Sequence, residues 1–305
     1  MVSGPRFGAV VTAMVTPFDD EGALDLGAAV ELARWLADNG SDGLVVTGTT
    51  GESPALTDEE RVDLWRSVAD AVTIPVLAGT GTAGTEHSVA MSRAAEAVGV
   101  DGILVVTPYY NRPPQSGIAA HFRAVAEATS LPVVLYDVPV RTGRRIAPEV
   151  LVALAADVPN IVGVKDATGD PAGAARVVAS TPDGFELYCG DDALTLPMMA
   201  VGAVGVISVA AHWVGDAMGA MVAAFAGGDH EGARTVNASL LESYAFETSD
   251  RYPNPLPAKA ACRALGLPVG QCRLPLGPAP DELDAAARQL VASLPAAARS
   301  PYHVG

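Results

Sequence analysis

The stretch GILVVTPYYNRPPQSGIAAHFRAVAEATSLPVVLY, residues 102–136, decides the fold. It begins with a continuous apolar run, Gly102–Thr107, and passes through a segment with helical periodicity, Ile118–Thr129. A second apolar run, Pro132–Tyr136, closes the stretch. Continuous apolar runs are typical of strands buried on both faces, and an intervening helix makes two such strands parallel. The stretch therefore predicts one strand–helix–strand unit of a parallel sheet.

The same unit recurs along the chain. From Thr47 to Lys165, successive runs end at intervals of 29 to 31 residues, and helical patterns such as Leu26–Asn39, Asp58–Ala71 and Glu86–Val98 lie between runs. An open doubly wound sheet has the same local pattern, but eight units in a row favour the α/β TIM barrel, (β/α)8, which we predict. The eight runs are Ala9–Val15, Gly43–Thr47, Ile74–Ala78, Gly102–Thr107, Pro132–Tyr136, Ile161–Lys165, Phe185–Cys189 and Val204–Val209.

The last part of the chain has no clear strand. Glu231–Phe246, Leu256–Leu265 and Pro280–Leu294 have helical periodicity, with Pro-rich and Gly-rich breaks between them. We therefore expect two units: residues 1–225 as the barrel catalytic domain and residues 226–305 as a small C-terminal helical extension. The tail Pro295–Gly305 is expected to be frayed.

Composition narrows the class of protein. Half of the 305 residues are hydrophobic and the formal net charge is −16, so a large core is available and nucleic-acid binding is disfavoured. Three cysteines without CxxC spacing indicate neither a disulfide framework nor a zinc site. No secretory leader and no apolar stretch of about 18 residues is visible, so we expect a cytoplasmic protein without a membrane span.

Polar residues follow the predicted strands where each of them ends. In a TIM barrel this edge carries the active site. We therefore expect the chemistry to lie among Gly48–Glu52, Thr107–Asn111, Tyr136–Pro139, Lys165–Asp166 and Gly190–Asp192.

Lys165 is the most informative of these residues. The chain contains 17 arginines but only two lysines, Lys165 and Lys259. Lys165 follows the apolar run Ile161–Val164, where poor solvation disfavours the ammonium and leaves the amine available as a nucleophile. The alternative is a lysine whose stem packs on the barrel and whose head reaches water.

Other residues at this edge have both a chemical and a structural interpretation. The Gly48–Glu52 turn could hold a carboxylate through hydroxyl and backbone N–H donors, or simply precede a helix capped near Thr57. Tyr110 and Tyr136 could carry protons or only pack. Arg141 could clamp a carboxylate with two hydrogen bonds, or lie on the surface.

Cofactor and metal motifs are weak. Gly79, Gly81 and Gly84 match the G-x-G-x-x-G dinucleotide pattern, but in the third unit instead of the first, and Asp101 precedes the next strand instead of ending it. We expect neither a cofactor nor a metal, because the histidines are scattered without ligand spacing. They are His87, His121, His212, His230 and His303.

Four motifs occur in an order that resembles a known family, dihydrodipicolinate synthase (4-hydroxy-tetrahydrodipicolinate synthase), within the N-acetylneuraminate lyase superfamily of class I pyruvate aldolases. The resemblance runs from about Phe7 to Leu294 and includes Asn254–Lys259. The motifs are Gly48–Ser53, Thr107–Pro113, Tyr136–Gly143 and Val162–Asp166.

The resemblance implies a catalytic group. Lys165 corresponds to the lysine that condenses with pyruvate, and Tyr136 to the proton carrier above it. Thr49 and Tyr110 correspond to the rest of a proton relay, with Tyr110 supplied by a neighbouring subunit. The covalent imine then takes the place of a cofactor.

It also implies substrate contacts. Thr50 corresponds to the ligand of the pyruvate carboxylate and Arg141 to the ligand of the carboxylate of L-aspartate 4-semialdehyde, while Gly190 and Ile207 match backbone contacts. Val140 departs from the family, whose members usually carry a smaller residue there.

The implied protein is a lyase of lysine and diaminopimelate biosynthesis that assembles at least as a dimer and, by resemblance, as a homotetramer. Two other functions remain open: a sister aldolase, of the N-acetylneuraminate lyase or keto-deoxy-sugar type, and an inactive binding protein on the same barrel. Sugar substrates need no carboxylate clamp at Arg141, so this residue separates the first two.

Regulation depends on a departure from the family, in which L-lysine often inhibits by binding between two subunits. The inhibited members present His, His, Asn and Glu where this chain has Asp58, Arg61, Ala83 and His87. Tyr109 alone remains, and one hydroxyl anchors a charged ligand weakly. We expect weak or absent inhibition by L-lysine.

Overall fold

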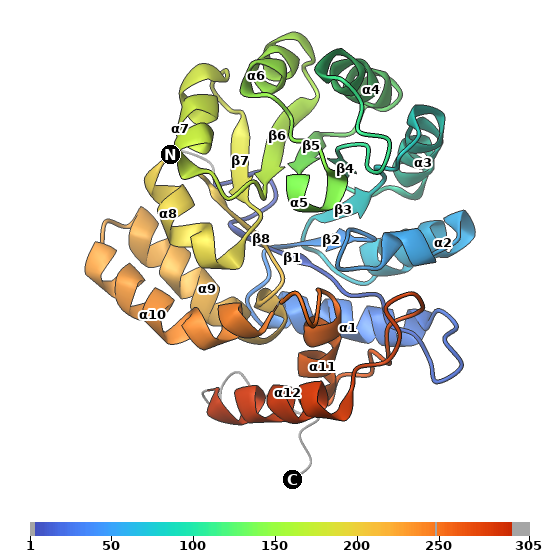
Figure 1. Cartoon of the computed structure of the whole chain (residues 1–305), viewed down its shortest axis with the longest axis vertical. Helices are drawn as coiled ribbons and strands as arrows, with labels where there is room; N and C mark the ends of the chain where they lie inside the picture. The colour runs from blue at the N-terminus through green and yellow to red at the C-terminus, as the bar shows by residue number, and fades with distance from the viewer. Residues whose placement is uncertain (1–3, 248, 295–305) are drawn as a thin grey trace.

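A closed barrel of eight parallel strands, in the order β1 to β8, forms the centre of the molecule (Figure 1). A computed structural model describes residues 4–247 and 249–294, so the predicted frayed tail lies outside the described residues. The TIM barrel prediction is confirmed. The strands are β1 (Val10–Ala13), β2 (Gly43–Val46), β3 (Val76–Gly79), β4 (Gly102–Val106), β5 (Val133–Asp137), β6 (Ile161–Asp166), β7 (Glu186–Cys189) and β8 (Gly205–Ser208).

Helices surround the barrel and cover the outer face of its strands (Figure 1). Three short helical turns lie among the loops that follow strands: η1 (Ser53–Ala55), α5 (Pro139–Thr142) and η2 (Asp192–Leu194). The longer helices are α1 (Leu26–Asp38), α2 (Asp58–Ala69), α3 (Thr85–Val98), α4 (Gln115–Glu127), α6 (Pro148–Asp157), α7 (Pro171–Ser180), α8 (Thr195–Ala200) and α9 (Ala211–Ala226).

The strands are continuous apolar runs because both of their faces are buried. One set of side chains, including Val11, Leu77 and Val134, fills the barrel interior. The alternate set, including Val10 and Ile103, packs outward against the helices. A strand enclosed in this way has no polar face, and period-two polarity is therefore absent from the sequence.

Three further helices follow the barrel: α10 (His230–Phe246), α11 (Leu256–Ala264) and α12 (Asp281–Ser293). In Figure 1, α10 lies alongside α9, and α11 and α12 lie together below α1. Buried residues of α10 and α11 join the main core. The division near residue 225 stays a prediction. No helix in the described ranges is long and apolar enough to cross a membrane.

A buried ion pair ties α11 to the loop that follows β2. The Lys259 Nζ atom lies 2.8 Å from Glu52 Oε1, and neither side chain is more than 1% exposed. Lys259 also donates to the carbonyl oxygen of Gln271 at 2.9 Å, and its Nζ lies 4.1 Å from the centre of the Phe18 ring. Glu52 has a left-handed φ of 54°, a strained conformation for a residue with a side chain. The pair therefore holds this loop in a shape that it would not adopt freely.

Removal of Lys259 should be costly. Lys259→Met keeps the volume but leaves a buried carboxylate without its cation, and we expect a loss of about 3–5 kcal/mol in the free energy of unfolding. Urea unfolding measures this loss. The matched control is Arg66→Met, because Arg66 pairs with Asp63 at 2.9 Å with both side chains half-exposed, and such a pair contributes less than about 1 kcal/mol. Equal losses in the two variants would contradict the expectation.

Candidate active site

Lys165 and Tyr136 are brought together by strand register. They are direct partners in the pairing of β5 with β6. Their side chains are 4% and 6% exposed, and Lys165 Nζ lies 4.5 Å from the centre of the Tyr136 ring. The sequence-based alternative of a lysine head in bulk water is therefore wrong. The amine is shielded from bulk solvent and faces an aromatic ring.

Gly190 leaves room for the lysine. A Cβ atom at this position would lie 3.1 Å from Lys165 Cε and 2.9 Å from Ala167 Cβ. Ile207, on β8, is 2% exposed and belongs to the barrel interior with Tyr136. It does not line the cavities described below, whereas Val209 does. A backbone contact at Ile207 stays a prediction.

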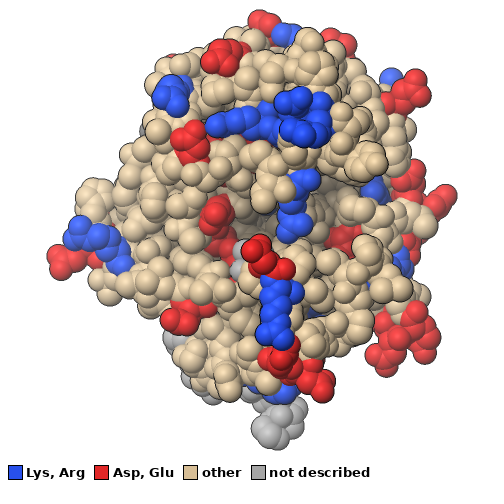
Figure 2. All heavy atoms as spheres, viewed as in Figure 1, with Lys and Arg blue, Asp and Glu red and all other residues tan. Residues whose placement is uncertain are grey.

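Two adjoining cavities open at this end of the barrel, and they share Thr49, Tyr136, Val138 and Arg141. The inner cavity, of about 190 Å³, contains Lys165, Gly190 and the acidic Asp191 and Glu247 among its walls. The outer cavity, of about 350 Å³, is bordered by Tyr109 and Tyr110. Figure 2, in the same view as Figure 1, shows the molecule hollowed near the middle of this face, with charged side chains of both signs around the hollow. Six of the predicted site residues thus line the inner cavity, and they come from the ends of four strands: Thr49, Thr50, Tyr136, Arg141, Lys165 and Gly190.

Thr50 and Arg141 meet through Asn254, to which the sequence analysis gave no role although the resemblance includes it. The Asn254 side-chain amide donates to Thr50 Oγ at 2.9 Å, and the Asn254 backbone carbonyl oxygen accepts from Arg141 Nη2 at 3.3 Å. Asn254 also lines the inner cavity. A residue just before α11 therefore connects both predicted carboxylate ligands. Their separation of more than 100 residues from Asn254 explains why no local pattern revealed it.

Tyr110 stands apart from the buried group. Its side chain is 93% exposed, and its φ of 71° is unusual for a bulky residue. Thr49 is half-buried and lines both cavities. Within the described parts of the chain, no direct hydrogen bond joins the hydroxyl groups of Thr49, Tyr110 and Tyr136. In a single subunit, the three residues of the predicted relay therefore line the same outer cavity but are not joined by direct hydrogen bonds.

The glycine motif after β3 has a packing explanation. A Cβ atom on Gly79 would lie 2.3 Å from the carbonyl oxygen of Thr47, and one on Gly81 would lie 2.4 Å from the backbone nitrogen of Val106. Close approach of neighbouring backbones requires glycine at both positions. A search of the described residues finds no cluster of three His, Cys, Asp or Glu side chains with the arrangement of a metal site.

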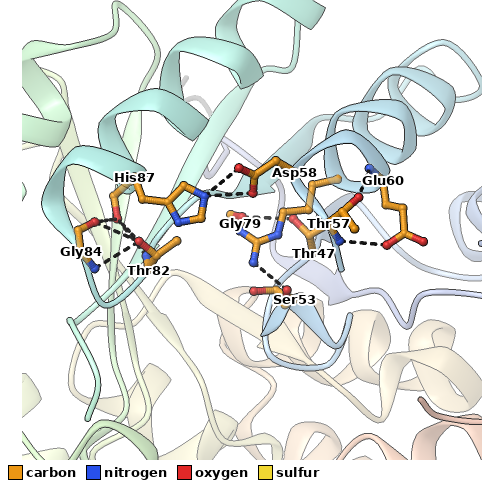
Figure 3. Close-up of polar contacts among 11 residues, drawn as sticks. Thr47, Ser53, Thr57, Asp58, Glu60, Gly79, Thr82, Gly84 and His87 are labelled. Atoms are coloured by element: carbon orange, nitrogen blue, oxygen red, sulfur yellow. Dashed lines mark hydrogen bonds and ion pairs between the residues drawn. The ribbon is translucent and has the colours of Figure 1, made fainter. Parts of the chain in front are cut away.

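The predicted regulatory positions lie between the starts of α2 and α3. His87 points toward Asp58, and its Nε2 lies 2.9 and 3.0 Å from the two carboxylate oxygens (Figure 3). Arg61 is buried, and it donates to the carbonyl oxygen of Ser53 at 2.6 Å. Asp58 carries a carboxylate at one of these four positions, and this carboxylate is paired with His87.

The comparisons with known proteins agree with this geometry. The sequence model of the dihydrodipicolinate synthetase family matches residues 6–294. The 4-hydroxy-tetrahydrodipicolinate synthase of Moorella thermoacetica is 51% identical over 275 residues, which are 89% of this chain and 92% of the relative. The dihydrodipicolinate synthase structure of Bacillus anthracis is 44% identical with a TM-score of 0.92, over 95% of this chain and 99% of that chain. That of Cyanidioschyzon merolae, solved with lysine bound, is 44% identical with a TM-score of 0.90, over 93% and 96%. The chain therefore belongs to the dihydrodipicolinate synthetase family.

Proposed function

We propose that this enzyme condenses pyruvate with L-aspartate 4-semialdehyde to form 4-hydroxy-tetrahydrodipicolinate, with Lys165 as the nucleophile. The observation that carries the proposal is the burial of the Lys165 amine against Tyr136 in a cavity that Arg141 also borders. An amine in such a place forms an imine with a ketone and needs no cofactor. The reaction belongs to lysine and diaminopimelate biosynthesis.

The chemistry follows from the positions of the groups. The Lys165 amine attacks the ketone of pyruvate, and water leaves as the imine forms. The imine withdraws electrons, so that a methyl proton leaves and an enamine results. The enamine carbon bonds to the aldehyde carbon of the second substrate, whose amine then displaces Lys165 in the ring closure. Each step moves a proton, and Tyr136, with Thr49 and Tyr110, is the proposed carrier.

Substrate recognition rests on neutral and cationic donors. Thr50 offers a hydroxyl group to the carboxylate of pyruvate. Arg141, an exposed side chain that borders both cavities, offers a guanidinium group to the carboxylate of the semialdehyde. Gly190 and Ile207 are proposed to contact substrate through the backbone. A sugar-derived aldehyde has no carboxylate for Arg141, so the sister aldolase activities are less well supported.

The nucleophile can be identified by trapping. Borohydride with pyruvate should reduce the imine and leave a stable three-carbon adduct on Lys165, which peptide mass mapping locates. Lys259 is an internal control because the ion pair with Glu52 buries it completely. Lys165→Arg should abolish trapping, since a guanidinium stays protonated. An adduct on Lys259 alone would contradict the assignment.

Arg141→Ala separates the two substrates in the same assay. It should leave trapping by pyruvate largely intact but reduce kcat/KM for the semialdehyde by roughly 10- to 100-fold, as expected for about 1.5–3 kcal/mol from a charge-assisted pair. Full synthase activity in this variant, together with turnover of a sugar-derived aldehyde, would instead favour a sister aldolase.

The active unit is proposed to be at least a dimer, and by family resemblance a homotetramer. Tyr110 and Val140 are 93% and 88% exposed beside the cavities, and a second subunit would cover such side chains. Tyr110 would then complete the relay in the neighbour's site. Light scattering under assay conditions measures the assembly, and a fully active monomer would contradict this part of the proposal. The same proposal places the enzyme in the cytoplasm, which cell fractionation tests.

Inhibition by L-lysine is expected to be weak or absent. Asp58 is paired with His87, and the buried Arg61 offers no negative charge, so neither position provides a free carboxylate for the ammonium groups of the ligand. Loss of two or more charge-assisted contacts weakens binding on the order of a hundredfold or more. A titration of the initial rate with L-lysine tests this expectation. Half-inhibition below the millimolar range would show that other contacts bind the ligand.

A further inference from the structure

Two carboxyl groups are buried beside Lys165. Asp192, at the start of η2, is 2% exposed, and Glu247, directly after α10, is 8% exposed. Asp192 Oδ2 accepts hydrogen bonds from the backbone nitrogens of Val209 and Ala210 at 2.9 and 2.7 Å. Two backbone N–H donors stabilise negative charge at this carboxyl group.

The Asp192 carboxyl group lies close enough to Glu247 to interact with it. Asp192 Oδ1 and Glu247 Oε2 are both buried, and no other group satisfies them. Two carboxylates cannot share a hydrogen bond unless one of them holds a proton. Burial, and then the charge of Asp192, raises the pKa of Glu247 well above its usual value. Glu247 is therefore the protonated member and donates to Asp192.

The neighbouring groups do not neutralise the pair. Asp191 adds negative charge, and Tyr244 and Cys189 are buried and protonated because burial raises the pKa of each. His212 accepts from the backbone nitrogen of Val15 through Nε2 at 3.1 Å, and burial lowers its pKa to about 4, so it is neutral. Among the ion pairs of the described residues, none includes Asp192 or Glu247.

The protonated member is the one that faces the amine. Glu247 lines the inner cavity with Lys165, whereas the buried Asp192 does not line it. An ionised Glu247 would stabilise the ammonium form of Lys165, which cannot attack a ketone. It would also repel the carboxylate of an entering keto acid. A neutral acid at this place avoids both effects.

We propose that Glu247 is a positioning residue that presents a neutral acid, and not a second carboxylate beside Asp191, to the Lys165 amine, with its proton held by the Asp192 carboxyl group. This inference rests on the proposed imine chemistry at Lys165. It assigns to the pair a function distinct from substrate binding: the pair determines whether Glu247 faces the amine as a neutral acid or as an anion. The pair also joins the end of α10 to the loop after β7, so the C-terminal segment supplies part of this wall.

Exchange of the charge between the two residues tests the proposal. Asp192→Asn keeps an oxygen for the two backbone donors, and its amide donates to Glu247, which moves the charge to the cavity wall. The rate of borohydride trapping with pyruvate, measured from pH 6 to 10, reports the free amine. We expect the Asp192→Asn rate near neutral pH to fall about tenfold or more and the profile to move to higher pH, as a one-unit change predicts.

The double variant Asp192→Asn with Glu247→Gln provides the decisive comparison. It removes the displaced charge, so the trapping rate should recover most of the loss and the profile should return toward lower pH. A purely structural role of Asp192 would not be rescued by a second substitution. Glu242→Gln, on the exposed face of α10, is the matched control for loss of a carboxylate. Urea unfolding of every variant shows whether each remains folded.

The outcomes distinguish this inference from the proposed function. If wild-type enzyme forms no adduct, the imine chemistry itself is wrong. If wild-type enzyme is trapped but Asp192→Asn leaves the pH profile unchanged, or Glu247→Gln fails to rescue it in a folded double variant, the charge-placement proposal is overturned. Trapping with a shifted and then restored profile supports it.

Discussion

The buried ion pair between Glu52 and Lys259 is the constraint on which the active site depends. It holds the loop after β2, which carries Thr49 and Thr50, against helix α11. The segment just before α11 brings in Asn254, which contacts both Thr50 and Arg141. The barrel alone would supply the lysine and the tyrosine but not the arrangement of Thr50 and Arg141, the proposed carboxylate ligands. The C-terminal helices therefore contribute to the proposed active site as well as to the core.

Much of the barrel could be predicted because the burial of both faces of each strand leaves a signal in the local sequence. A strand enclosed on both faces must be apolar throughout, and each apolar run contains a strand whose ends differ from the prediction by no more than about two residues. Because the apolar runs recur at a regular spacing, residues one repeat apart occupy equivalent positions on neighbouring strands. Tyr136 and Lys165, which are 29 residues apart, are therefore register partners. The convergence of polar residues at one end of the barrel follows from the same regularity.

Contacts between distant segments could not be predicted in this way. Nothing local in the sequence distinguishes Glu247 from the exposed acids of the same helix, and its role depends on Asp192, 55 residues earlier. From the sequence, Lys259 is identifiable as the second lysine and as the end of the segment Asn254–Lys259 but has no assigned partner, although it completes the most buried ion pair among the described residues. Tertiary packing selects these partners, and a single sequence contains no periodic signal for it. Tyr110 is similar, since its exposed side chain has a role only if a neighbouring subunit is present.

The distribution of charge connects the site with the composition of the whole chain. An enzyme with a formal net charge of −16 repels the carboxylates that it must bind, and nearby acids would hold a catalytic amine in its ammonium form. The cavity counters both effects with few groups. Arg141 borders both cavities, Thr50 is a neutral donor, and two backbone N–H groups bind the Asp192 carboxyl group. With Glu247 protonated, as proposed above, one negative charge fewer faces Lys165 on the cavity wall. The acidic surface and the nucleophilic amine can therefore coexist because the fold determines where each negative charge lies.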